Sequence, residues 1–137
     1  MKSKKKKYAH KVAKKKEESF LSTKKSDQLL TTTDRLTYIY VIDINTNKTI
    51  EVVNVSYEIK VEGDWKTIIR FDSAHGYLHR HSRVSLDDEK ETTTRESVKQ
   101  KGDPKRWLTW AIHDIQENFL EYRRLFFKRS KVIDSFY

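Results

Sequence analysis

Three histidines, His75, His79 and His81, lie within seven residues near the middle of the chain. His79 and His81 are two residues apart, so on an extended strand both side chains point to the same face of a sheet. Imidazoles can accept and donate protons near neutral pH, because the unperturbed pKa of histidine lies in that range. The spacing therefore marks this segment as the first candidate for chemistry.

Three interpretations of the histidine segment stay open. The first is metal-independent RNA cleavage, in which one imidazole accepts the 2′-hydroxyl proton, another protonates the leaving oxygen and Arg70 stabilises the phosphorane. The second is a zinc site completed by Asp72 or Glu58. The third is structural, with imidazoles hydrogen-bonded to these carboxylates on a half-exposed sheet face. The catalytic candidates are His75, His79, His81, Arg70 and Asp72, with no cofactor; if a metal binds, His75, His79 and His81 are its candidate ligands.

Four segments around these histidines alternate apolar and polar residues, as strands with one buried face do. The segments are rich in β-branched and aromatic residues, and short turns containing Asn, Asp, Gly and Ser separate them. The pattern predicts a four-stranded antiparallel β-meander, with strands at about 36–44, 50–61, 65–72 and 77–86.

The turn lengths predict the register of this sheet, because a slip of one residue would turn every side chain to the opposite face. A four-residue turn at 73–76 places Arg70 opposite His79 and Asp72 opposite Tyr77. In this register the histidines share the open face with Arg70 and Asp72, and His75 lies at its rim. The same reasoning pairs Tyr40 with Val53, Tyr38 with Val55, Ile59 with Thr67, Tyr57 with Ile69, Phe71 with Leu78, Ile68 with His81 and Trp65 with Val84.

A long helix is predicted after a polar loop at 87–103. Asp103 is a suitable N-cap and Pro104 a suitable first helical residue, so the helix should extend over about 104–129. An apolar stripe predicts that it covers one face of the sheet, which makes the fold class α+β. Basic residues at its far end suit the helix dipole and solvent, with phosphate contact as the alternative. The stripe contains Leu108, Ile112, Ile115, Phe119, Tyr122 and Phe126, and the basic cluster contains Arg123, Arg124, Lys128, Arg129 and Lys131.

The N-terminal segment differs in composition from the rest of the chain. Residues 1–25 contain eleven lysines and two glutamates, which accounts for the whole net charge of +9. We expect residues 1–34 to be a disordered or marginally helical tail and residues 35–137 to form one domain. The tail could contact polyphosphate or serve only to solubilise the chain. The candidate nucleic-acid contacts are Lys4, Lys5, Lys6, Lys7, Lys14, Lys15 and Lys16, together with Arg83.

Composition also excludes several classes of protein. The chain contains no cysteine, which rules out disulfides, thiol catalysis and cysteine-bound zinc. No apolar run is long enough to cross a bilayer, and no apolar segment of a secretory signal follows the basic N-terminus. We therefore expect a cytoplasmic protein without a membrane partner.

The histidine segment resembles a known pattern. Residues 70–75 read Arg-Phe-Asp-Ser-Ala-His, and residues 79–81 read His-Arg-His. This resembles the TumE-like proteins of prokaryotic toxin–antitoxin loci and their small relatives, found mainly in archaea. Ser73 occupies the position where those proteins usually carry asparagine. The resemblance implies a toxin-like protein that cleaves RNA and has a cognate antitoxin as partner.

Two functional hypotheses follow. The leading one is an RNA-directed, toxin-like protein that acts as a metal-independent ribonuclease through the His/Arg/Asp cluster on one sheet face. The alternative is a non-catalytic module that binds nucleic acid or protein and has a structural histidine cluster. The expected partners are RNA or another nucleic acid and an antitoxin protein, and the sequence leaves a homodimer open.

Overall fold

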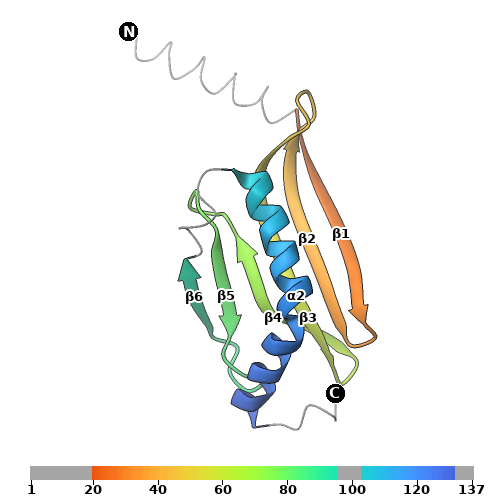
Figure 1. Cartoon of the computed structure of the whole chain (residues 1–137), viewed down its shortest axis with the longest axis vertical. Coiled ribbons are helices and arrows are strands. Elements are labelled where there is room, and N and C mark those ends of the chain that lie inside the picture. Colours follow the sequence, from red (N-terminus) through yellow and green to blue (C-terminus); the bar gives the residue numbers. More distant parts are fainter. Residues whose placement is uncertain (1–19, 96–102, 132–137) are drawn as a thin grey trace.

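The computed structural model describes residues 20–95 and 103–131. In these ranges the chain forms one antiparallel sheet in which each strand pairs with the next, and a long helix crosses one face of it (Figure 1). No helix in the described ranges is long and apolar enough to span a membrane. The elements are β1 (Leu21–Thr31), β2 (Asp34–Asp43), β3 (Lys48–Val61), β4 (Asp64–Asp72), β5 (His79–Arg83), β6 (Glu91–Arg95) and α2 (Pro104–Ser130).

The predicted antiparallel sheet and single C-terminal helix are confirmed, but the sheet has six strands and not four. Strand β1 forms from residues that the sequence analysis assigned to the tail, and β6 forms within the predicted loop. Both are edge strands with mostly exposed side chains, so neither shows the apolar alternation that identifies a half-buried strand. Strand β6 contains three consecutive threonines, which favour extended backbone.

Bulges in β3 and β4 change the register that the turn lengths predicted. Tyr40 pairs with Val52 and not with Val53, because Val53 is an extra residue in β3. In β4, Ile68 is the extra residue, and it turns Trp65 and the residues beside it to the opposite face. The predicted Ile59–Thr67 and Trp65–Val84 pairs are therefore wrong, whereas the Tyr38–Val55 and Tyr57–Ile69 pairs are confirmed.

The β4–β5 connection contains six residues, 73–78, and not the predicted four. Ser73 stays attached to β3, where its backbone N–H donates to the Val52 carbonyl at 3.0 Å and its hydroxyl accepts from the Val52 N–H at 3.0 Å. The chain then turns at Gly76, whose φ of 82° suits glycine. Pairing moves by two residues, so the predicted partners in this hairpin are wrong, but the paired side chains of residues 69–72 and 79–82 keep their predicted face.

Helix α2 covers the face of the sheet that carries the core. Asp103 caps it by accepting a hydrogen bond from the Lys105 N–H at 2.9 Å, and Lys131 ends it with a left-handed backbone. Ile115 is fully buried against the sheet. The helix residues that it buries are Trp107, Leu108, Ala111, Ile115, Arg123, Phe126 and Phe127.

One ion pair lies inside this apolar layer. Arg123 donates to Asp34 at 3.0 Å, and their side chains are 8% and 4% exposed. The Tyr57 hydroxyl also donates to Asp34. Burial raises the pKa of Asp34, but hydrogen bonds from Thr31, Tyr57 and Arg123 outweigh this and hold the pKa below its usual value. The expectation that Arg123 belongs to a solvated basic cluster is therefore wrong.

Replacing Ile115 with alanine should lower the free energy of unfolding by about 2–5 kcal/mol, because it removes a fully buried side chain and leaves a cavity. Chemical denaturation measures the loss. Leu120→Ala on the same helix is the control, since Leu120 is 65% exposed and its truncation should have little effect. Equal losses for the two variants would contradict the described packing.

Replacing Asp34 with asparagine should cost about 3–5 kcal/mol at neutral pH, because it removes the carboxylate charge that lies 3.0 Å from the buried Arg123 guanidinium. The pKa of Asp34 is lower in the folded chain, so its stabilising effect is present above about pH 4 and is lost as the pH falls further. Urea denaturation from neutral to acidic pH should show the gap between wild type and variant closing below about pH 4. A gap that stays constant would contradict this assignment. Glu121→Gln is the control, since Glu121 pairs with Arg124 on the exposed helix surface.

Candidate functional site

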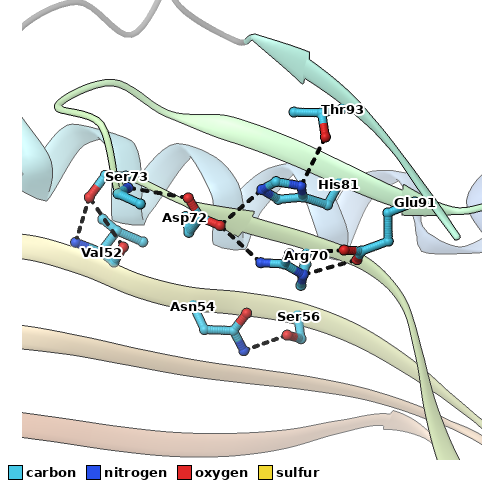
Figure 2. Close-up of polar contacts among 10 residues, drawn as sticks. Val52, Asn54, Ser56, Arg70, Asp72, Ser73, His81, Glu91 and Thr93 are labelled. Atoms are coloured by element: carbon cyan, nitrogen blue, oxygen red, sulfur yellow. Dashed lines mark hydrogen bonds and ion pairs between the residues drawn. The ribbon is translucent and has the colours of Figure 1, made fainter.

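The face of the sheet opposite α2 carries a polar network that spans β4, β5 and β6 (Figure 2). Asp72 lies at its centre, at the end of β4 and two residues beyond Arg70, so both side chains share this face. The Asp72 carboxylate accepts hydrogen bonds from Arg70 at 2.9 Å and from the Ala74 N–H at 3.2 Å, and its Oδ2 lies 2.9 Å from Nε2 of His81. These three contacts fix the orientation of this carboxylate.

His81 lies between a carboxylate and a hydroxyl. Its Nε2 is 2.9 Å from Asp72 Oδ2, and its Nδ1 is 3.1 Å from Thr93 Oγ1 (Figure 2). An ionised carboxylate can only accept, so a neutral His81 ring carries its proton on Nε2. Nδ1 is then an acceptor, and the Thr93 hydroxyl donates to it. A carboxylate that orients an imidazole whose other nitrogen contacts a hydroxyl is the arrangement of a general base.

Arg70 is held by two carboxylates. It forms a two-point contact with Glu91, with both N···O distances 2.9 Å, and a third bond to Asp72 (Figure 2). Hydrogen bonding to Glu91 raises the pKa of the Arg70 guanidinium; burial opposes this, and the charges of Glu91 and Asp72 reinforce it. Arg70 is therefore compensated within the sheet, and it positions Asp72.

The imidazoles of His75, His79 and His81 form a row and do not converge on one point. His79 is 8% exposed, and its ring centroid lies 4.2 Å from that of Tyr77, 5.8 Å from His75 and 6.2 Å from His81. His75 is exposed in the β4–β5 connection. Among the described residues, no group of three His, Cys, Asp or Glu side chains is arranged to hold a metal ion.

The structure brings together some of the predicted residues and separates others. Arg70 lies opposite His81, and Asp72 lies opposite His79, on the face that the sequence predicted. Glu58, considered as a metal ligand, instead pairs with Arg35 through two bonds of 3.0 and 3.1 Å. The candidate lysines Lys4, Lys5, Lys6, Lys7, Lys14, Lys15 and Lys16 lie outside the described residues.

Arg83 is not part of the polar network around Asp72. It lies at the end of β5, where its guanidinium donates to the carbonyls of Ser85 and Leu86 at 2.9 and 2.7 Å. It also lines a cavity beside α2. Arg83, a predicted nucleic-acid contact, therefore lies apart from the histidine row, and backbone carbonyls fix its guanidinium.

Sequence reasoning missed Glu91 and Thr93. Both lie in β6, within the segment predicted to be a loop, and their side chains point to the same face because they are two residues apart. The run of threonines at 92–94 was the available signal for a strand. The contacts to Arg70 and His81 depend on strand pairing, which local composition does not encode.

The neutral His81 ring should carry its proton on Nε2 in mildly alkaline solution, since Asp72 can only accept there. Long-range proton–nitrogen correlation NMR distinguishes the two tautomers. Asp72→Asn should weaken the preference, because an amide can also donate, whereas Thr93→Val should preserve it. His113, exposed on α2, is the reference histidine. A wild-type His81 protonated on Nδ1 would contradict the described network.

Comparison with known proteins assigns the chain to a family. Residues 15–132 match the model of a family described as Domain of unknown function (DUF7718), which covers more than half of the chain. No curated protein and no solved structure is significantly similar to the chain.

Proposed function

This chain belongs to the DUF7718 family, and we propose that the open face of its sheet cleaves RNA without a metal, with His81 as general base. One observation carries the proposal: Asp72 orients the His81 ring so that its second nitrogen contacts a hydroxyl at 3.1 Å on an accessible strand. Thr93, the residue that supplies this hydroxyl, is exposed, so a substrate hydroxyl can take its place. The other members of the network hold this geometry.

In the proposed reaction, the phosphoryl group of an RNA phosphodiester moves from the 5′-oxygen of the next nucleotide to the neighbouring 2′-oxygen. The 2′-hydroxyl proton moves to Nδ1 of His81, and the 2′-oxygen attacks the phosphorus. Asp72 stabilises the imidazolium that forms. The 5′-oxygen of the next nucleotide leaves and takes a proton from water. The products are a cyclic phosphate and a free 5′-hydroxyl, and the hydroxide that forms takes the proton back from His81.

The remaining residues of the row have positioning roles in this proposal. His79 is buried between its neighbours and contacts the rings of both Tyr77 and His75, so it holds these rings in place. Arg70 fixes Asp72 and contributes no free charge to the phosphate. The lysines of residues 1–19 would supply sequence-independent contacts to the RNA backbone.

The resemblance of residues 70–81 to the TumE-like pattern supports an RNA target and extends the proposal to partners. Proteins of toxin–antitoxin loci are held inactive by a cognate antitoxin, so we propose such a protein as the partner of this chain. The runs 70–75 and 79–81 carry the resemblance, and their Arg70, Asp72, His79 and His81 lie on one face of the sheet.

A second candidate function is a non-catalytic module that binds nucleic acid or protein. The observation that favours it is the mutual satisfaction of the network, since Arg70, Asp72, His81 and Glu91 all bond to one another or to β6. In that case the histidines would hold β6 to the rest of the sheet. The two candidates differ in what the loss of His81 should do.

Incubation of the full chain with total RNA, with and without a chelator, tests the proposal. His81→Ala should reduce the cleavage rate by about a hundredfold or more, since positioned acid–base groups contribute that much. Asp72→Asn should also slow cleavage, because it releases the ring. Thr93→Val should keep most of the activity, because the substrate hydroxyl replaces that of Thr93. His113→Ala is the matched histidine control on the exposed side of α2.

The outcomes separate the candidates. A wild-type chain that cleaves no RNA would indicate the binding module. Variants of His81 and Asp72 would indicate it too if their loss of activity is no larger than their loss of folded protein explains. Activity that a chelator abolishes would contradict the metal-free mechanism. Thermal denaturation of each variant shows whether the fold survives, and a folded but inactive His81→Ala protein supports the base.

A further inference from the structure

A cavity of about 350 Å³ lies on the helix side of the sheet, on the opposite face from the histidines. It forms because α2 packs mainly on β3, and β5 and β6 extend to one side of it (Figure 1). The residues of β5 and β6 that face this gap are polar, so they do not fill it as core side chains would. Its lining includes Ile68, Ile69, Leu125, Ser82, Thr92 and three arginines.

The three arginines give the cavity its charge. Arg83 and Arg129 donate to backbone carbonyls, those of Ser85 and Leu86 and that of Val84. Neither forms an ion pair with a carboxylate in the part of the chain that the structure describes. Carbonyls fix a guanidinium in place but do not neutralise it. Two positioned positive charges therefore border the cavity.

The third arginine, Arg80, has a partial counter-charge. Its positive charge interacts electrostatically with the carboxyl of Asp114 on α2, which also accepts a hydrogen bond from the Tyr122 hydroxyl. Burial raises the pKa of Asp114, and the positive charge of Arg80 opposes the rise. Asp114 does not line the cavity, and no residue of the lining is acidic. The described lining thus combines cationic and hydroxyl groups with an apolar floor.

We propose that this cavity binds a small organic phosphate. Arg83 and Arg129 would hold the phosphate, because guanidinium groups match its oxygens in charge and geometry. The hydroxyls of Ser82 and Thr92 would add hydrogen bonds, and the organic part would pack on Ile68 and the side chains beside it. The volume lies within the range of small-molecule sites. The inference does not depend on RNA cleavage, because the two sites lie on opposite faces of the sheet.

Titration of the full-length chain tests the site with four nucleoside 5′-monophosphates, inorganic phosphate and the aromatic carboxylate benzoate. A nucleoside monophosphate should bind, and amide NMR shifts should concentrate at Ser82, Val84 and Thr92. Arg129→Gln should weaken binding by at least about tenfold, because it removes a charge-assisted contact. Arg124→Gln is the matched control: it removes the same charge from α2 at a position where Arg124 pairs with the exposed Glu121.

Several results would overturn the proposal. They are no binding of any probe in the millimolar range, binding of benzoate only, equal weakening by both arginine variants, or shifts confined to the histidine face. Inorganic phosphate that binds as tightly as the nucleotides would refute the role of the apolar floor. Arg129→Lys keeps the charge but loses the two-point geometry, so it should give intermediate affinity, and a thermal melt of each variant confirms that it is folded.

Discussion

The buried ion pair between Asp34 and Arg123 is the constraint on which the arrangement of this fold depends. It joins the start of β2 to the second half of α2, and the Tyr57 hydroxyl of β3 donates to the same carboxylate. Taking two charges out of water is costly, so the helix must sit where both charges and their hydrogen bonds are satisfied together. The apolar stripe alone would permit the helix to slide along the sheet, whereas the ion pair specifies one position.

With the helix in that position the other face of the sheet stays open, and the hydrogen bonds of Ser73 determine how that face is arranged. Ser73 remains bonded to Val52 of β3 after β4 has ended, which lengthens the connection to β5. The longer connection moves β5 by two residues, so His81 rather than His79 comes to lie opposite Arg70. The choice of His81 as the histidine opposite Arg70 thus depends on the hydrogen bonds between Ser73 and Val52, which lie three strands away from β6.

Much of this fold could be predicted from local sequence. The strands that carry the histidines, the helix with its Asp103 cap and the shared face of Arg70, Asp72 and His81 all follow from periodicity, because an error of two residues in register does not change the face. The bulge at Ile68 could not be predicted in this way, since it depends on what Trp65 packs against. Trp65 lies under the Arg35 guanidinium at 4.5 Å, and Arg35 comes from another strand.

The edge of the sheet at β1 has a consequence for self-association. Among the described residues, β1 pairs with a strand on one side alone, so a second copy could add its own β1 along the other side and continue the sheet. Lys24 and Lys25 lie in the middle of β1, are exposed and point to opposite faces of the sheet. Copies joined at this edge would bring lysines together on either face, and the repulsion between these charges would oppose a dimer formed through β1.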